Sequence, residues 1–512
     1  MDAPTESSSL LPRAELPEIH HPLPALMPYV RGLPQDHHPS FQEIKFLSLP
    51  EASASARAAF GLLALLYLIC EPEEPLPRFA TPWDEWQELE RRQTRHANLE
   101  AAVLRYWQEF EQDEAEKDLE ELLWTEFLLE GDSDKVLRVA DYLANPLVPS
   151  ALLTQASIEL ALLRAWEQGV PTRCRVVETT EPPILQRYDS ITTPRIAHAI
   201  ALGIQLFYMY QIAHYVLWPN IITIYKAPGD TDDGDEIDYI SNPREVFIVI
   251  FSLSDLLARP YRRPQSFASL LAFLSFLLSF PDTPKPRTTP FSFLLLSLIL
   301  HTFNLHFSLL SPTLLLSPSW ILPLVTLYRL LIVRVLRPAF YFCLPAILGA
   351  AILLSTSLDD INLIVRAPLN TISMFSLASA PEETRLTSLI ILGLAVAMML
   401  YLIHGVATLF PIVIAPPRRP ISPWDAYDRE IGIVARRTFV TALLRYSEPY
   451  FFPATIRLMV LVCVSLPASI IRLTGKTEMA LRVREGVKSL LWRALIGPAG
   501  VLISLIFWRW WR

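Results

Sequence analysis

Cysteine is scarce in this chain, and its few copies are too scattered to build a site together. The 512 residues contain four cysteines, and none of them lies in a CxxC pair. Structural zinc sites and the disulfide frameworks of small secreted domains need closely spaced cysteines, so the sequence predicts neither. The four residues are Cys70, Cys174, Cys343 and Cys463.

The motifs of the common enzyme classes are absent as well. The chain has no Gly-rich phosphate loop, no GxSxG and no HExxH, each of which carries a specific chemistry. The net charge is −8, and the sequence contains no basic stripe. We therefore expect no surface that is complementary to the phosphate backbone of a nucleic acid. We expect a protein that is not an enzyme, holds no cofactor and binds no nucleic acid.

The start of the chain also lacks a secretory pattern. It is acidic, and no basic segment followed by a short apolar stretch is present. We therefore expect that no signal peptide is cleaved, that the first membrane span carries the insertion signal, and that the N-terminal region stays in the cytosol.

Apolar sequence is abundant, and most of it lies after Ile196. Hydrophobic residues make up 52% of the chain, and the mean hydropathy of +0.31 is too high for an ordinary soluble protein. The sequence predicts an all-α, polytopic membrane protein. Its expected parts are a Pro-rich, partly disordered N-terminus (1–50), a cytosolic helical linker domain (51–195), a transmembrane domain (196–415), and a cytosolic, amphipathic and membrane-associated C-terminal region (416–512).

The predicted linker domain shows helical patterns throughout. Ala58–Cys70 is continuously apolar but too short to cross a bilayer, which favours a core helix of a soluble domain. Apolar residues recur at three and four positions within 82–130, and two further amphipathic helices are expected at Asp132–Ala144 and Ala151–Gly169. Gly169 is a stop signal for the last of these helices.

The distribution of Lys and Arg favours about six spans, with both termini in the cytosol. An interfacial or re-entrant position for Ser266–Phe280 keeps Lys285, Arg287, Arg334 and Arg337 on the cytosolic side. The candidate spans are Ile196–Trp218, Glu245–Ala258, Phe291–Leu310, Trp320–Leu336, Ala339–Leu358 and Leu386–Ala415.

Two apolar segments follow the last predicted span. Ile456–Ile471 contains Pro467 and precedes several basic residues, so an in-plane or shallow re-entrant helix is favoured. Leu490–Trp511 ends in FWRWWR, a pattern typical of an interfacial anchor. The sequence leaves open whether 266–280, 456–471 and 490–511 cross the membrane.

Residues 338–415 form a hairpin of two apolar runs around a polar loop, as in many pore domains. The loop is predicted to be lumenal, and its carboxylates are Asp359, Asp360, Glu382 and Glu383. Repeated by symmetry in a homo-oligomer, these pore-mouth candidates would form acidic rings that concentrate cations. The alternative is a plain connection between two helices.

Charges within the spans are further candidates, because burying them in lipid is costly. Asp255 lies in the second span, while Arg329 and Arg334 lie in the fourth. An Asp–Arg contact between these spans would offset the cost; the alternative is that the arginines extend to the interface. The histidines of the spans show no metal-ligand spacing and are interpreted as hydrogen-bonded within the bundle. They are His198, His214, His301, His306 and His404.

An acidic segment follows the first span, on the predicted lumenal side. It could bind calcium weakly, or be a solvated loop, since its glycine does not fit an EF-hand. Its carboxylates are Asp230, Asp232, Asp233, Asp235, Glu236 and Asp238.

The order of these parts resembles the fungal vacuolar TRP-type cation channels, the family of the yeast vacuolar conductance channel. The resemblance lies in the helical linker domain, the acidic loop after the first span, the phrase NPREVFIVIFSLSDLL at 242–257, the basic inner loop after it, and the pore-like hairpin. It implies a tetrameric, calcium-permeable channel of a vacuolar or other endomembrane, with calcium as a permeant or regulatory ion. The alternative is a non-conducting polytopic adaptor that binds partners through the N-terminal domain.

Overall fold

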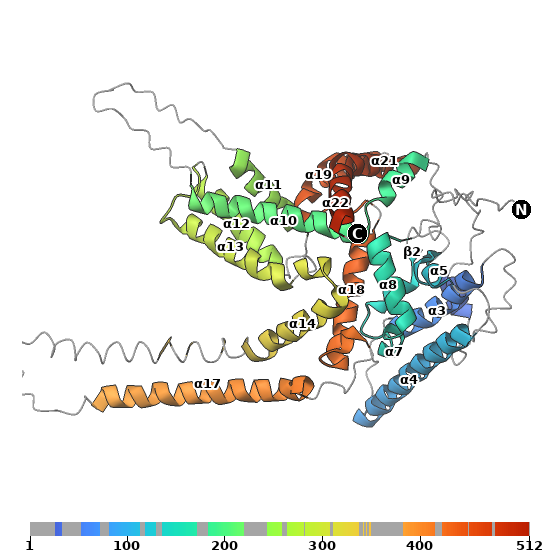
Figure 1. Ribbon diagram of the computed structural model, residues 1–512, viewed down its shortest axis with the longest axis horizontal. Helices are drawn as coiled ribbons and strands as arrows, with labels where there is room; N and C mark the ends of the chain where they lie inside the picture. Colours follow the sequence, from blue (N-terminus) through green and yellow to red (C-terminus); the bar gives the residue numbers. More distant parts are fainter. Residues whose placement is uncertain are drawn as a thin grey trace, which may run out of the picture. The chain divides into compact units, whose positions relative to one another are not determined.

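The computed structural model is helical in nearly all of its described residues (Figure 1). The only strands among them are β1 (Phe127–Leu128) and β2 (Val136–Leu137), which pair in antiparallel fashion. The predicted all-α class is thus confirmed for this part of the chain. The structure describes residues 26–32, 53–71, 81–112, 118–129, 136–170, 183–219, 243–258, 264–280, 282–307, 311–336, 382–414, 422–448, 450–473 and 477–510, with isolated positions between 341 and 349.

Tertiary contacts divide the chain into two compact units, which are described separately. The first contains residues 1–316 and 437–512, and the second contains residues 317–436. The expected boundaries at 51, 196 and 416 do not coincide with this division. The linker helices, the helices between 194 and 307 and the C-terminal helices all pack within the first unit.

The linker helices pack around α3, which is buried along nearly its whole length. Ser53 caps its start by accepting a hydrogen bond from the Ala56 amide (2.9 Å), and Tyr106 of α4 donates to the Ala58 carbonyl (3.1 Å). The predicted core helix at Ala58–Cys70 is therefore confirmed. The helices of this region are α1 (Leu26–Gly32), α3 (Ala54–Cys70), α4 (Pro82–Gln112), α5 (Leu119–Trp124), α6 (Val139–Leu143), α7 (Ser150–Leu153), α8 (Ala156–Gln168) and α9 (Pro183–Ser190).

Two predicted helices of this region are wrong in part. Phe127–Leu128 and Val136–Leu137 pair as strands, so that α6 begins at Val139 instead of near Asp132. Helical periodicity cannot reveal this, because a two-residue strand has no period, and Phe127 is buried as a helix residue would be. The stop at Gly169 is confirmed: its φ of 93° ends α8 in a conformation that glycine adopts readily.

The thiol of Cys70, at the end of α3, is expected to resist alkylation. Desolvation raises its pKa from 9.0 to about 11, which lowers the thiolate fraction at pH 8 by about 100-fold, and thiolate is the reactive form. Peptide-resolved mass spectrometry with iodoacetamide should therefore show labelling about 100-fold slower in the folded chain than after denaturation. Equal rates in both states would contradict the burial of this helix end.

Four helices of the first unit form a bundle, α10 (Pro194–Leu217), α11 (Pro243–Ala258), α12 (Pro264–Ser279) and α13 (Thr289–Phe307). α12 packs against both α11 and α13, and α10 packs against α11 and α13. Ser297 of α13 donates to the Ala268 carbonyl of α12 (2.7 Å), a close approach that small residues permit. The segment 266–280, expected to be a separate interfacial or re-entrant piece, is thus an integral helix of the bundle. The bundle centre contains Tyr208, Ile212, Tyr215, Ile248, Ala272 and Leu294.

The C-terminal helices of the first unit pack on this bundle. They are α18 (Arg429–Ser447, which belongs to this unit from Arg437 on), η5 (Ala454–Ile456), α19 (Arg457–Val460), the π-helical turn η6 (Leu461–Ser465), α20 (Leu466–Leu473), α21 (Thr477–Leu495) and α22 (Gly497–Trp510). α11 contacts η5 and α19, and α10 contacts α22. Ser254 of α11 connects the two groups: its hydroxyl donates to the Ala454 carbonyl (2.7 Å) and accepts from the Leu458 amide (2.8 Å).

Two helices among the described residues are long and apolar enough to cross a membrane. They are α10 and the continuous helix Ala454–Leu473, of which only 11% is buried. The α21–α22 pair would add a third if its 43° bend is a break within one span. We expected 456–471 to lie in the membrane plane; its length and composition are also those of a span.

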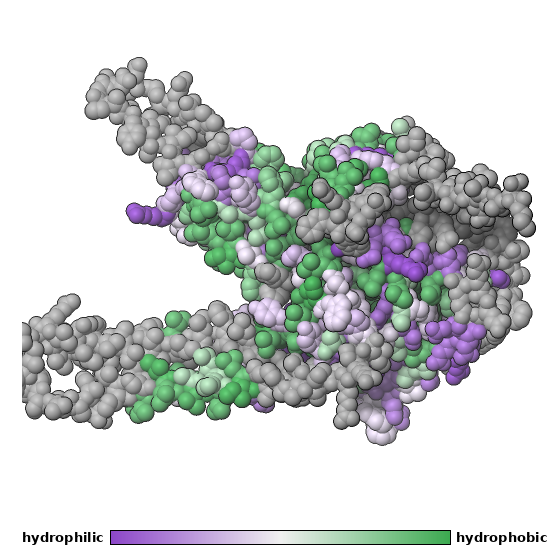
Figure 2. Space-filling model, in the orientation of Figure 1, coloured by the Kyte–Doolittle hydropathy of each residue, from purple (hydrophilic) through white to green (hydrophobic). Residues whose placement is uncertain are grey.

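The second unit contains a short and a long apolar helix. α14 (Pro318–Leu331) contains Pro323 and continues into the π-helical turn η3 (Ile332–Leu336), and α17 (Glu382–Ile414) has 33 residues. α14 contacts α17 and η4 (Pro423–Asp425). Large apolar side chains are exposed on several sides of α17, where Figure 2 shows a hydrophobic surface. They are Leu386, Leu389, Ile390, Leu392, Val396, Met399, Leu400 and Ile403.

Candidate functional site

A cluster of buried side chains from distant parts of the chain surrounds His198, in the first turns of α10. The helix begins after Thr193, with Pro194 in its first turn. His198 is fully buried, and its Nε2 lies 3.1 Å from the Ser311 carbonyl oxygen. Because a carbonyl only accepts, Nε2 carries the proton. Nδ1 then has no proton and has no hydrogen-bond partner among the described residues.

Aromatic rings from two other helices surround this imidazole. Tyr446 of α18 lies 5.0 Å from it, and Trp166 of α8 lies 5.8 Å from it, measured between ring centroids. Trp166 also meets Phe439 of α18 edge-on at 5.6 Å. We call Trp166, His198, Ser311, Phe439 and Tyr446 the base cluster. It joins the linker domain, the first turns of α10, the segment after α13, and α18.

The chain segments just before and just after the second unit are each held within the first unit by an arginine side chain that donates to backbone carbonyls. Before the second unit begins at Ser317, Arg195 donates to the Leu315 carbonyl (2.5 Å) at the end of η2 (Pro312–Leu315). After it ends at Arg436, Arg437 donates to the carbonyls of Pro146 and Val148 (3.1 Å each). Partial burial lowers the pKa of Arg437, and these carbonyl contacts compensate part of the lost hydration.

The interior of the bundle is polar at several levels. Tyr208 shares a hydrogen bond with Ser252 (2.8 Å), and its ring meets His301 edge-on at 5.1 Å. Gln205 lies within 3.5 Å of His301, and Ser269 donates to the buried Asp255 carboxylate (2.5 Å). A polar interior inside an apolar exterior is typical of bundles whose surroundings are lipid.

The predicted intramembrane charges fall into both units. Asp255 is 1% exposed in the first unit, whereas Arg329 and Arg334 are exposed in the second. The contact proposed between them stays a prediction. Asp359, Asp360 and the acidic loop at 230–238 lie outside the described residues, and Glu382 and Glu383 form the first turn of α17.

Sequence reasoning placed His198 in a bundle but missed its partners. Ser311 is 113 positions away from it and Trp166 belongs to the linker domain, so no local pattern connects them. The only available signal was the large aromatic residues on α8 and α18, which indicated buried faces but not which faces meet. Across the described ranges, no three His, Cys, Asp or Glu side chains gather in a possible metal site.

Known proteins add no further indication of what this arrangement does. No protein-family model, no curated protein and no solved structure matches the chain.

Proposed function

We propose that this chain is a subunit of a TRP-type cation channel in an endomembrane. One observation carries the proposal: a four-helix bundle with buried polar side chains in its interior is followed by a separate unit that contains the long apolar helix α17. Channels of the family that the sequence resembles combine such a bundle with a hairpin that forms the pore in a tetramer. Calcium is the expected permeant or regulatory ion.

The packing of α12 supports a different set of about six spans from the one expected. In this proposal the spans would be α10, α11, α12, α13, the expected span Ala339–Leu358, which lies largely outside the described residues, and α17, while the expected span Trp320–Leu336 would no longer be one. Lys285 and Arg287 then face the lumen, where Lys285 pairs with Asp282 (2.7 Å), and Arg334 stays at the cytosolic end of the fifth crossing. Both termini would remain cytosolic, and the loop Asp359–Arg385 would remain lumenal.

The exposed surface supports a lipid environment and neighbouring subunits. Apolar side chains surround α17 on several sides, and a helix that is apolar all round needs lipid or protein around it. The bundle likewise exposes Phe267, Leu277, Ile299 and Phe303, while Ser252, Ser254, Ser269, Ser275 and Ser297 are buried. An α17 bundle at the centre of a homo-tetramer would cover part of this surface.

Patch recording on enlarged vacuoles tests the proposal. We expect a cation conductance on expression, under calcium or osmotic stimulation, that is absent from vacuoles without the protein. No conductance in a membrane shown by immunoblot to contain the chain would refute it.

Neutralising the pore-mouth candidates should lower the single-channel conductance. Replacing Asp359, Asp360, Glu382 and Glu383 by Asn or Gln removes the predicted acidic rings, whose effect on local cation concentration is strongest at low salt. A severalfold lower conductance at low ionic strength, converging with wild type at high salt, is the expected result. Asp230→Asn with Asp232→Asn is the matched control, since it changes lumenal charge away from the hairpin. Equal effects of both sets would contradict the assignment.

One observation favours the adaptor as the second candidate. The first turns of α4 are exposed, and Trp83 and Trp86 stack there with ring centroids 4.9 Å apart while being 61% and 50% exposed. Exposed tryptophans are typical of binding surfaces. Purification of the full chain with Trp83→Ala and Trp86→Ala should then lose a partner that wild type retains, while vacuolar conductance is absent from both.

A further inference from the structure

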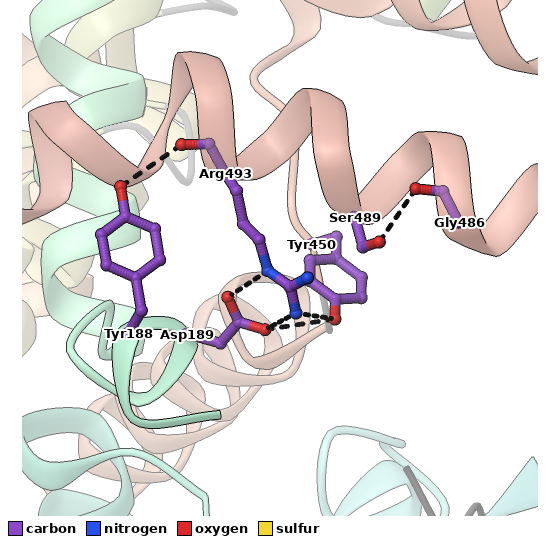
Figure 3. A network of polar contacts seen from close by, with 6 residues as sticks. All are labelled: Tyr188, Asp189, Tyr450, Gly486, Ser489 and Arg493. Atoms are coloured by element: carbon purple, nitrogen blue, oxygen red, sulfur yellow. Dashed lines mark hydrogen bonds and ion pairs between the residues drawn. The ribbon is translucent and has the colours of Figure 1, made fainter. Parts of the chain in front are cut away.

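A second polar cluster lies just before α10, where α9 meets the C-terminal helices (Figure 3). Arg493 of α21 binds Asp189 of α9 with two nitrogens, Nε to Oδ1 at 3.0 Å and Nη2 to Oδ2 at 2.6 Å. Tyr450 donates to Asp189 Oδ2 (3.2 Å) and accepts from Arg493 Nη2 (3.3 Å). We call Asp189, Tyr450 and Arg493 the clamp. Its members lie as far as 304 positions apart in sequence.

Backbone strain accompanies these contacts. Tyr450 has a φ of 55°, in the left-handed region that residues with a side chain rarely adopt. Its ring packs edge-on against Trp492 at 5.7 Å and lies below the Arg493 guanidinium. The clamp contacts therefore hold Tyr450 in a conformation that the free chain disfavours, and their loss would release it.

Two glycines place α22 in direct contact with the segment that leads into α10. A Cβ on Gly497 would lie 2.2 Å from the Tyr188 hydroxyl oxygen, and one on Gly500 would lie 2.7 Å from Thr192 Oγ1. Tyr188 also donates to the Arg493 carbonyl (3.3 Å). Beyond this point Trp492 and Ile496 pack on Ile196 and Ile200 of α10. At Gly497 a Cβ would overlap three atoms of the Tyr188 ring and hydroxyl, whereas at Gly500 it would be too close to the Thr192 Oγ1 alone.

The clamp also lies at a bend. α21 and α22 meet at 43° around Ile496, three residues after Arg493. The side chains of Arg493 and Asp189 are 16% and 22% exposed, so water reaches the ion pair. A water-accessible ion pair, a strained residue and a bend at one place are the properties of a joint that can open, in contrast to the dry base cluster nearby.

We propose that α21 and α22 are a releasable brace on the first span: the clamp holds α22 against α9 and α10 in the resting state, and its release lets α10 move when the channel opens. The expected effect on current rests on the proposed channel function. The release of α22 from α9 and α10 does not depend on that function and can be measured in the isolated protein. Ser311 and Phe439, which belong to the base cluster together with His198 of α10, lie six positions before and three positions after the second unit in sequence.

A disulfide across the brace tests the need for release. The Cβ built on Gly500 lies 3.7 Å from Thr192 Cβ, within the range of about 3.5–4.5 Å that disulfides use. In a chain whose native cysteines are replaced by serine, Thr192→Cys with Gly500→Cys is oxidised with copper phenanthroline, and mass spectrometry verifies the linked peptides. Stimulated current should fall at least about tenfold, a loss of about 1.4 kcal/mol of opening free energy, and return with dithiothreitol.

Unchanged current with the disulfide verified would overturn the brace. Each single cysteine variant is the control for the substitutions themselves, and oxidation should leave its current unchanged. Loss of current in a single variant on oxidation would assign the effect to another reaction and also overturn the interpretation.

A second measurement is independent of conduction. Arg493→Gln removes the charge of the clamp, and we expect amide hydrogen exchange at residues 497–506 of the full chain in detergent to become about tenfold faster. Arg484→Gln is the matched control, since Arg484 is exposed on the same helix and outside the clamp. Arg493→Lys should lie between wild type and Arg493→Gln, because it keeps the charge without the two-point contact. Equal exchange in Arg493→Gln and Arg484→Gln would refute the clamp even if vacuoles show current, while faster exchange without any current would refute only the channel.

Discussion

Replacing Trp166 by alanine is expected to cause the largest loss of stability in the first unit, about 3–5 kcal/mol. Trp166 is 1% exposed and fills the space between α8, α10 and α18. Its removal takes away the ring that packs on His198, Phe439 and Tyr446, and partial collapse cannot refill a site formed by three helices. The thermal midpoint of the full chain in detergent should fall by several degrees.

Trp166→Phe is the matched control for this prediction. It keeps an aromatic ring in the base cluster and removes an indole N–H that has no hydrogen-bond partner among the described residues. Because this N–H makes no hydrogen bond there, its removal should cost little. The loss in free energy of unfolding should therefore be less than half as large in Trp166→Phe as in Trp166→Ala. Equal losses in the two variants would mean that packing at this position is not the source of the effect.

The same variant separates stability from coupling. If the base cluster transmits motion to both ends of the second unit, Trp166→Ala should reduce stimulated current even at a temperature where the protein stays folded. Trp166→Phe should preserve most of it. This comparison requires equal amounts of the two variants in the vacuolar membrane, which immunoblots of isolated vacuoles can establish.

The sequence predicts helices well here and contacts between them poorly. The continuous apolar run of α3 could only be a core helix or a span, and its length excluded the span. The Gly169 stop follows equally from local chemistry. Asp189 and Arg493, in contrast, are two of many charged residues, and nothing in their neighbourhoods marks them as partners across 304 positions.

Helix–helix packing within 266–280 is a feature that the count of Lys and Arg does not address, because α12 packs between α11 and α13 whether or not it crosses the membrane. Counting Lys and Arg favoured an interfacial segment, because a span there leaves Lys285 and Arg287 outside. The rule treats every basic residue alike, whereas Lys285 is paired with Asp282. Ser269, Ser275 and Ser297 are fully buried at the α12 contacts, and serines at such positions are typical of packed membrane helices.

Removing the carboxylate of Asp425 is expected to destabilise the second unit by about 3–5 kcal/mol, because it takes a two-point carboxylate contact away from a buried guanidinium. Arg436 binds Asp425 with two nitrogens (2.6 and 2.9 Å), and its side chain is only 3% exposed. The Trp424 ring lies 5.8 Å from the same guanidinium. Asp425→Ala should therefore lower the thermal midpoint of the full chain, and Gly432→Ala should do so as well, since its Cβ would lie 2.2 Å from Asp425 Oδ1.

The double variant decides whether the ion pair itself is the cause. Replacing both partners by apolar residues of similar volume, Asp425→Leu with Arg436→Met, removes the buried charge together with its counter-ion. We expect this variant to be more stable than Asp425→Ala, although it carries one more substitution, because the buried guanidinium is removed together with its carboxylate partner. A double variant that is less stable than the single one, by the sum of both losses, would show that the two residues act independently. The ion pair would then not hold η4 against α18 in the way the distances indicate.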